Sequence, residues 1–191
     1  MVDYYSDINP KIIDNVKEKI IDGAVIIYPT ETVWALGCNA SNSKSVSRIF
    51  RIKNRDENKP LICLLSNFEE LKHYVDLPSQ KVRDKLNLTI HPTVIYQNCI
   101  NKLNHVSNDK NELAIRITPL KKLKLLIDAI QSPIVSTSAN ISGEPFPIKF
   151  EDIDKRIIDS VDIIFNFDTK SSGNPSKIIR IDEFGALQYI R

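Results

Sequence analysis

Residues 28–61 read YPTETVWALGCNASNSKSVSRIFRIKNRDENKPL, and this stretch decides the fold because its polar turn joins a strand pattern to a helix pattern. The apolar run at 24–28 predicts a strand that is buried on both faces. The turn at 29–32 follows, and a short amphipathic helix comes after it, with Asn42 or Ser43 as its N-cap. The side chains that share one face of this helix are Val46, Ile49, Phe50 and Lys53. Lys53 is therefore predicted to end an inward-facing stripe.

A cluster of cations, Lys53, Arg55 and Lys59, lies where this helix ends. Arginine offers phosphate oxygens a planar fork and lysine a point charge, and one cation 4 Å from a phosphate charge is worth about 4 kcal/mol at an effective dielectric of about 20. The five glycines form neither GxGxxG nor GxxxxGK, so side-chain cations would have to receive a polyanion such as a nucleotide. The alternative is a solvated helix end whose charge is balanced by Asp56 and Glu57.

Strand and helix patterns alternate outward from this stretch over most of the chain. Asn9 and Pro10 predict a helix start, and Gly23 predicts its end. Further helices are predicted after Thr118 and at about 151–159. Strands are predicted at 61–65, 93–96, 113–117, 134–136, 161–165, 177–181 and 187–190. The alternation predicts an α/β fold with a twisted mixed sheet and flanking helices, and the polar segment at 98–111 is predicted to be a loop.

Composition limits the class of protein. The 191 residues allow one domain with a sizeable core, and 42% hydrophobic and 26% charged residues are typical of a soluble globular protein. The net charge of +2 demands neither nucleic acid nor membrane, and no apolar run approaches the roughly 20 residues of a membrane span. Three cysteines without a CxxC pair or a preceding signal peptide indicate a reduced, cytoplasmic protein. Histidines are too few to predict a protein-built metal site.

Hydroxyl and amide groups directly follow an apolar strand at Ser136, Ser138 and Asn140. Ligands in open α/β sheets gather outside the carboxyl ends of strands, so these groups are candidates for binding. The alternative is a helix cap or turn, which such residues often form. The polar loop at 171–176 enters a strand that carries Arg180, and by itself this signal is weak.

Arg116 stands inside an apolar strand between Ile115 and Ile117. Because successive side chains of a strand point to opposite faces, Arg116 points away from its two neighbours. It is therefore either exposed on an edge strand or aimed at a ligand.

Five motifs in this order resemble the YrdC-like threonylcarbamoyl-AMP synthases. They are YPTETVWALG, KNR followed by Lys59-Pro60-Leu61, IRI at 115–117, STSANISGEP and PSKIIRI, and they span nearly the whole chain. The KxR and SxN pairs of this family fall on Lys53 with Arg55 and on Ser138 with Asn140. The resemblance implies a single YrdC-like domain over residues 1–191 around a concave basic cleft, without the additional C-terminal domain of longer members.

The implied reaction joins L-threonine, bicarbonate or CO2, and ATP into L-threonylcarbamoyladenylate and pyrophosphate. The product would pass to the machinery that makes t6A in tRNA, and whether this protein contacts tRNA itself is left open. Mg²⁺ would arrive bound to ATP. Positioning and charge stabilisation should supply most of the catalysis, as in other phosphoryl-type transfers.

The resemblance also suggests roles for individual residues. Lys53, Arg55 and Lys59 would neutralise the triphosphate. Ser138 and Asn140 would orient phosphate or threonine, and these two form the expected catalytic set with Lys53 and Arg55. The remaining assignments are Thr30, Thr32 and Arg116 for threonine or its carbamate, and Ser176 and Arg180 for closing over the nucleotide. No covalent nucleophile is needed, and Cys38 is expected to be a buried structural thiol.

The sequence departs from the family pattern at three places. Residues 90–94 replace a common PGPxT stretch, Leu64 stands where some members have histidine, and Trp34 with Ala35 replaces an aromatic residue followed by glycine. Two other functions remain open. One is an RNA-binding module that uses the same basic surface, and its binding would weaken steeply with salt. The other is a carbamoyl-adenylating domain that takes carbamoyl phosphate.

Overall fold

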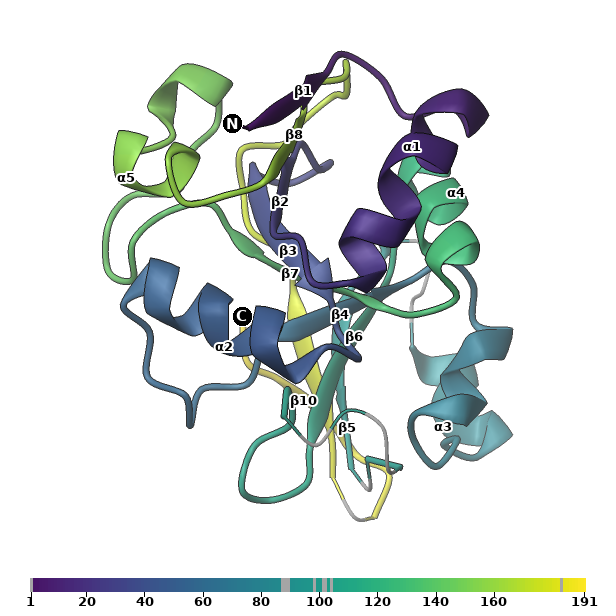
Figure 1. Cartoon of the computed structure of the whole chain (residues 1–191). Helices are drawn as coiled ribbons and strands as arrows, with labels where there is room; N and C mark the ends of the chain where they lie inside the picture. The colour runs from purple at the N-terminus through teal and green to yellow at the C-terminus, as the bar shows by residue number, and fades with distance from the viewer. Residues whose placement is uncertain (1, 87–89, 98, 101–102, 104, 183) are drawn as a thin grey trace.

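A ten-stranded sheet organises the residues that the structure, a computed structural model, describes, namely 2–86, 90–97, 99–100, 103, 105–182 and 184–191. The strand order is β1-β8-β2-β3-β7-β4-β6-β5-β9-β10 (Figure 1). The strands are β1 (Asp3–Tyr5), β2 (Ile26–Tyr28), β3 (Ala35–Asn39), β4 (Ile62–Leu65), β5 (Thr93–Tyr96), β6 (Leu113–Ile117), β7 (Ile134–Ser138), β8 (Ile163–Phe165), β9 (Ile178–Ile181) and β10 (Leu187–Tyr189). Both parallel pairs, such as β4 with β6, and antiparallel pairs, such as β3 with β7, occur. The predicted mixed α/β sheet is confirmed.

Helices lie on both faces of this sheet (Figure 1). They are α1 (Pro10–Ile21), α2 (Ser43–Lys53), α3 (Gln80–Lys85), α4 (Lys121–Ile130) and α5 (Lys155–Ile158), with short 3-10 helices at Glu69–His73 and Phe150–Asp152. The pair α1 and α4 pack against each other on one side, and α2 packs on β3 and α5 on the other. None of the helices in the described part of the chain has the length and apolar character needed to cross a bilayer.

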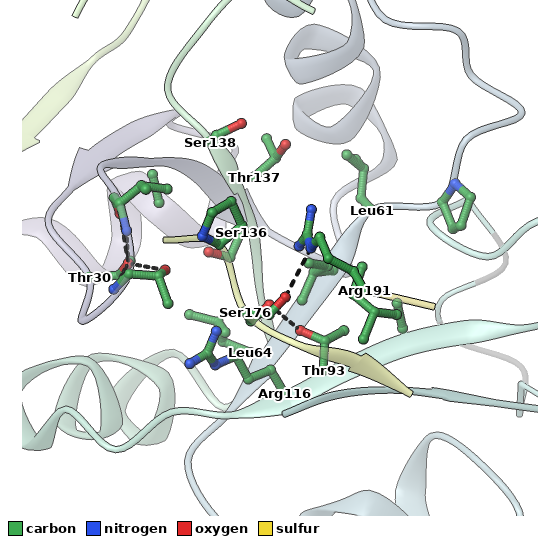
Figure 2. A pocket seen from close by; sticks show the side chains of 18 of the residues that line it. Thr30, Leu61, Leu64, Thr93, Arg116, Ser136, Thr137, Ser138, Ser176 and Arg191 are labelled. Carbon is green, nitrogen blue, oxygen red and sulfur yellow. Dashed lines mark hydrogen bonds between the residues drawn. The ribbon is translucent and has the colours of Figure 1, made fainter. Parts of the chain in front are cut away.

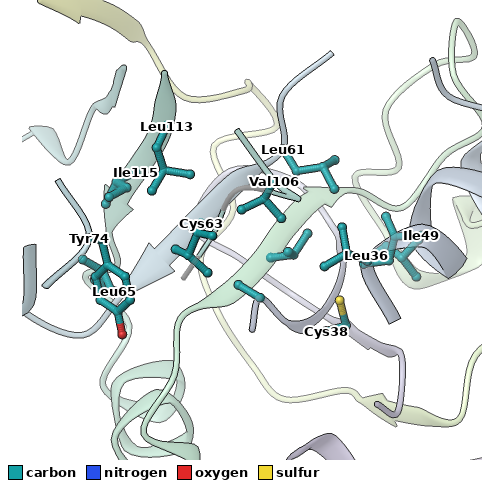
Figure 3. Close-up of a cluster of buried hydrophobic side chains, with 14 of the residues drawn as sticks. Leu36, Cys38, Ile49, Leu61, Cys63, Leu65, Tyr74, Val106, Leu113 and Ile115 are labelled. Atoms are coloured by element: carbon teal, nitrogen blue, oxygen red, sulfur yellow. The ribbon is translucent and has the colours of Figure 1, made fainter. Parts of the chain in front are cut away.

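Side chains alternate between the two faces of the sheet, as the period of two in a strand requires. Leu36, Cys63 and Leu65 join the hydrophobic cluster that includes the buried face of α2 (Figure 3). Ala35 and Leu64 join a second cluster, which includes the buried faces of α1 and α4. The sheet lies between the two clusters. Both of its faces are stabilised, because each cluster removes apolar surface from water.

Asn42 is the N-cap of α2. Its side-chain oxygen accepts a hydrogen bond from the backbone N–H of Ser45 at 3.1 Å, and its amide donates to the Ile21 carbonyl at 3.2 Å. We expect Asn42→Ala to lower the free energy of unfolding by about 1–2 kcal/mol, because both a cap and a tie to α1 are lost. Urea unfolding measures the change. Ser43→Ala, an exposed neighbour, is the control, and an equal loss in both variants would contradict this assignment of the cap.

The strand β3 was not predicted from the sequence pattern. All five residues of β3 are buried, so the strand shows no polar alternation. Gly37 explains how it fits: a Cβ at this position would lie 2.3 Å from the Val135 carbonyl oxygen and 2.8 Å from the Tyr28 ring. A glycine is therefore needed for the close approach of β3 to β7. The strand β1 was not predicted either.

Strand β7 is longer than predicted. It runs to Ser138, so that Ser136 and Ser138 are part of the strand and do not follow it. Because they alternate with Thr137, both can face the same side of the sheet.

The predicted loop at 98–111 lies partly outside the described residues, at 98, 101, 102 and 104. Of the described part, Leu103 and Val106 are buried in the same hydrophobic cluster as the inner face of α2, and Figure 3 labels Val106 in this cluster. The Val106 carbonyl accepts a hydrogen bond from Leu61 N–H at 3.4 Å. This polar-looking segment therefore contributes to the core beside the start of β4.

Candidate functional site

A pocket of about 490 Å³ opens on the face of the sheet that carries Ala35 and Leu64. We call it the main pocket. Its floor consists of alternate residues of neighbouring strands, which the register brings side by side: Ala35 opposite Ser138, Leu64 opposite Arg116, and Thr93 opposite Ile178. The same periodicity that buries one face of each strand therefore delivers these side chains to one surface.

The walls of the main pocket come from loops that are distant in sequence. They include Thr30 and Thr32 from the turn after β2, Lys59 to Leu61 before β4, Pro175 and Ser176 before β9, and Phe146 and Arg191. Figure 2 shows Thr30, Arg116, Ser176 and Arg191 around this space.

A second pocket of about 700 Å³ adjoins the first. We call it the polar pocket, because its lining includes Lys53, Asp56, Asn140, Ser142 and Glu144. The two pockets share Arg55, Lys59, Ser138 and Phe146. We refer to both together as the cleft. It collects every predicted site residue except Arg180.

Arg180 lies outside both pockets as they are lined by described residues. Its Nε lies 3.1 Å from Oε1 of Glu112, a residue that is 6% exposed. The expected role of Arg180 in closing over a nucleotide therefore stays a prediction, and in this structure the side chain links β9 to Glu112, the residue before β6, across the intervening strand β5.

Thr30 organises the turn between β2 and β3. Its hydroxyl donates to the Val33 carbonyl at 2.6 Å and accepts from the N–H groups of Thr32 and Val33 at 3.1 and 3.2 Å. Because the hydroxyl proton of Thr30 is already donated to Val33, Thr32 must donate the 2.8 Å hydrogen bond between the Thr30 and Thr32 hydroxyls. The lone pairs of Thr32 are then left to accept a hydrogen bond from a ligand.

Arg116 is buried in the floor of the main pocket, with 7% of its surface exposed. Its Nη2 lies 2.5 Å from Oε1 of Glu31, whose residue follows Thr30 in the same turn. Burial lowers the pKa of Arg116, and the Glu31 carboxylate opposes that effect. The Nε of Arg116 is buried and has no hydrogen-bond partner among the described residues. The sequence left open whether Arg116 faces solvent or a ligand, and the structure aims it into the pocket.

Lys53 is 2% exposed at the wall of the polar pocket. Its Nζ donates to the Ser138 carbonyl at 2.5 Å, to the Asn140 carbonyl at 2.7 Å and to the Asn140 side-chain oxygen at 3.2 Å. An ammonium group has three protons to donate, so all three have partners. Burial first, and then the Arg55 cation, lowers the pKa of Lys53 to about 7. In this arrangement Lys53 holds the turn after β7.

Arg55 reaches the junction of the two pockets because the chain turns at Asn54, the C-cap of α2, which has a φ of 48°. This left-handed residue turns the chain back, and Arg55 N–H donates to the Phe50 carbonyl at 3.0 Å. The guanidinium of Arg55 donates from Nη2 to the Pro60 carbonyl at 3.0 Å, which links it to the loop that carries Lys59. Two of the three predicted cations, Arg55 and Lys59, therefore line both pockets, and Lys53 lines only the polar one.

Ser138 and Asn140 form a tight pair at this junction. The Ser138 hydroxyl donates to the Asn140 side-chain oxygen at 2.5 Å, and the Asn140 amide donates to the Glu144 carbonyl at 2.6 Å. Ser138 can still accept hydrogen bonds, whereas the side-chain oxygen of Asn140 already accepts from Ser138 and Lys53. A ligand would therefore meet the Ser138 hydroxyl as an acceptor.

Thr93, Phe146 and Arg191 are among the lining residues that were not predicted as part of the site. Thr93 lies in the altered segment at 90–94, and its hydroxyl lies 2.8 Å from that of Ser176. Arg191 Nε donates to the Ser176 carbonyl at 3.0 Å. A cation at residue 191 has no local pattern around it, and only the pairing of β10 with β9 brings it to the pocket.

The loop at 171–173 closes against the turn that carries Glu31. Ser172 N–H donates to the Glu31 carbonyl and Gly173 N–H to the Thr32 carbonyl, each at 2.9 Å. The first motif of the sequence and the loop that precedes the last motif are therefore joined by main-chain hydrogen bonds.

Cys38 is not among the residues that line the cleft, and it is completely buried. Burial raises its pKa to about 12, so the reactive thiolate form is strongly disfavoured. This agrees with a structural thiol. Within the described part of the chain, no three His, Cys, Asp or Glu side chains are grouped as a metal site would need.

A family model described as telomere recombination, and named for Sua5, YciO and YrdC, matches residues 18–191. The chain belongs to the Sua5/YciO/YrdC family. A threonylcarbamoyl-AMP synthase from Vibrio campbellii is 29% identical over 174 residues, which cover 88% of this chain and 93% of the relative. One from Blochmanniella pennsylvanica is 31% identical over 171 residues, covering 86% and 88%. The predictions of this family and of a nucleotidyltransferase-type enzyme are confirmed.

Solved structures show the same fold. Sua5 of P. abyssi complexed with L-threonine has a TM-score of 0.87 at 23% identity and covers all of this chain, which spans 57% of the Sua5 chain. YciO of E. coli has a TM-score of 0.81 at 23% identity, covering 100% of this chain and 94% of that one. A full-length HypF in a phosphate- and nucleotide-bound form has a TM-score of 0.80 at 24% identity, covering 94% and 24%. The predicted YrdC-like fold is confirmed.

Proposed function

We propose that this protein is an L-threonylcarbamoyladenylate synthase, which converts L-threonine, bicarbonate or CO2, and ATP into threonylcarbamoyl-AMP and pyrophosphate for the t6A modification of tRNA. The observation that carries the proposal is the junction of two pockets of different chemistry. The main pocket holds a buried arginine with an unpartnered Nε, and the polar pocket shares Arg55 and Lys59 with it. The names of the sequence relatives and the threonine complex of the P. abyssi protein support it.

The main pocket has groups for each part of L-threonine. Arg116 would bind the carboxylate, because Glu31 uses only one end of its guanidinium and leaves Nε free. The amine would donate to the lone pairs of Thr32. The floor beside Arg116 is apolar, with Ile62, Leu64 and Ala114, and such a floor keeps water away from a carbamate that hydrolyses readily.

The polar pocket and its border would hold the triphosphate of ATP. The threonine nitrogen attacks CO2 and loses a proton, a carbamate oxygen then attacks the α-phosphorus, and the bond to pyrophosphate breaks. Arg55 and Lys59 would carry the charge of the phosphates, and Arg191 lies across the main pocket as a further cation. Mg²⁺ would arrive as part of the ATP substrate complex and would neutralise the departing pyrophosphate.

Arg55→Ala is expected to lower kcat/KM for ATP at least tenfold while the protein stays folded. The guanidinium is at the junction where the phosphates would lie, and one charge-assisted contact is worth about 1.5–3 kcal/mol. Arg51→Ala is the matched control, because Arg51 is an exposed cation of the same helix that lines neither pocket. Steady-state kinetics with ATP as the varied substrate measure the change. Equal activity of both variants and the wild type would remove Arg55 from the site.

Pyrophosphate release from ATP tests the function itself, with threonine and bicarbonate omitted in turn. We expect release only when both are present. Release that ignores threonine and requires carbamoyl phosphate would instead support a carbamoyl-adenylating domain, the activity that the HypF-like fold leaves open. Salt-sensitive RNA binding with no pyrophosphate release would support an RNA-binding module. We further propose that the protein works in the cytoplasm, where its three free cysteines would stay reduced and its product could pass to the t6A machinery.

A further inference from the structure

Phe146 is a solvent-exposed aromatic side chain at the junction of the two pockets. It is 44% exposed, and it is the apolar member of the four residues that line both pockets. It belongs to neither hydrophobic cluster of the described residues, whereas the aromatic side chains of Trp34 and Phe150 pack in one of them. An exposed ring at this position has apolar surface that nothing in the described chain covers.

The loop fixes this ring from both sides. Before it, the Glu144 carbonyl accepts from the Asn140 amide at 2.6 Å, and the Glu144 carboxylate lies 3.0 Å from Nη2 of Arg156. After it, the Pro147 carbonyl accepts from Trp34 N–H at 3.1 Å. Prolines on either side of Phe146 restrict the backbone further. These contacts and the two prolines hold the backbone on both sides of Phe146, so the position of the ring at the junction is fixed.

The surroundings of the ring select the chemistry of the ligand. Arg55 and Lys59 share the junction with Phe146, so a ligand there meets two cations and one aromatic face. A nucleotide has both parts: an anionic tail for the cations and a flat base for the ring. Base stacking on an aromatic side chain is sequence-tolerant and strong in partly enclosed sites.

We propose that Phe146 is the platform on which the adenine base of ATP stacks. The inference rests on the proposed function for the identity of the nucleotide, but not on threonine. Phe146 then determines how tightly the base is held, while Arg55 and Lys59 hold the phosphates. The ring touches no reacting atom and acts by binding the nucleotide.

Titration calorimetry with two ligands isolates the contact with the base. Magnesium-ATP has a base, and magnesium-tripolyphosphate has the same anionic tail without one. We expect Phe146→Ala to raise the Kd for magnesium-ATP at least tenfold, within the range of roughly 5- to 150-fold that stacking provides, and to leave the Kd for tripolyphosphate unchanged within twofold. Phe146→Tyr should stay within threefold of the wild type for both ligands, and Phe146→Leu should fall between.

Ile148→Ala is the matched control, because Ile148 is 52% exposed in the same loop and lines neither pocket of the cleft. It should bind both ligands as the wild type does. Equal weakening of ATP and tripolyphosphate by Phe146→Ala would overturn the proposal, as would no weakening of either. Wild-type protein that binds no magnesium-ATP would overturn both proposals. Protein that shows the stacking effect but releases pyrophosphate without threonine would overturn only the proposed function.

Discussion

Replacing Lys53 with methionine is expected to reduce threonine-dependent pyrophosphate release more than a hundredfold. Methionine keeps the apolar stem but removes the donors to Ser138 and Asn140. The turn that carries the Ser138 hydroxyl into the cleft then loses its fixed position, and a misplacement of about 1 Å can cost a factor of about 10² in rate. The free energy of unfolding should fall by about 3 kcal/mol, because buried acceptors are left without donors at about 1–3 kcal/mol each.

Kinetics and urea unfolding of the same preparation test this prediction. Lys44→Met is the matched control, since Lys44 is exposed in the first turn of the same helix, and both of its values should equal those of the wild type. If Lys53→Met kept full stability and raised only the KM for ATP, Lys53 would be a phosphate ligand, as the sequence motif suggests. A joint loss of stability and turnover would identify it as a positioning residue.

The pH dependence of the free energy of unfolding, compared between the wild type and Lys53→Met, gives an independent readout. Lys53 has a pKa of about 7 in the folded protein against an ordinary value of 10.5, so between these values the unfolded chain binds more protons than the folded one. The free energy of unfolding of the wild type should therefore rise with pH across this window, relative to Lys53→Met, and the difference should level off below pH 7. A difference that is constant over this range would contradict the burial of this ammonium group.

Replacing Arg116 with glutamine is expected to raise the KM for threonine about a hundredfold and to change the KM for ATP less than threefold. The lost group is a buried charge-assisted donor, whose contact with a carboxylate is worth about 1.5–3 kcal/mol. Stability should fall as well, by about 2–3 kcal/mol, because the partly buried Glu31 carboxylate loses its partner.

The double variant Glu31→Gln with Arg116→Gln separates these two effects. Removing both charges should restore most of the stability, since no unpaired carboxylate remains, but it should not restore the use of threonine. Glu31→Gln alone keeps the guanidinium and should change the KM for threonine much less than Arg116→Gln does. Equal increases in the KM for threonine and for ATP in Arg116→Gln would place Arg116 at the nucleotide instead.

Much of the cleft could be predicted because its residues belong to compact motifs. Thr30, Arg55, Ser138 and Ser176 each stand in a short polar segment beside an apolar strand, and that signal is local. Arg116 was recognisable as a cation inside an apolar strand. Its partner Glu31 was not, because an ion pair across 85 residues of chain depends on the register of β6 and the position of a turn next to another strand.

Two of the predicted cations have partners within the chain that no local pattern showed. Arg180 lies outside both pockets, where it is paired with Glu112. Lys53 was expected to meet phosphate, and the structure surrounds its ammonium group with oxygens of the chain. Arg191 and Phe146 were not predicted, because neither lies in a sequence pattern that indicates a site. They are recognised only from the residues that surround them in the folded chain.

Local sequence was sufficient to specify most helices and strands, their buried faces and the set of polar turns that could bind a ligand. These features depend on the periodicity of one segment at a time and on the conformational preferences of turn and cap residues. The fold of the whole chain decided which cations are free and which are already paired, how the two pockets meet, and why a glycine must stand where β3 meets β7. Such outcomes depend on distances between segments far apart in sequence, and no local pattern contains that information.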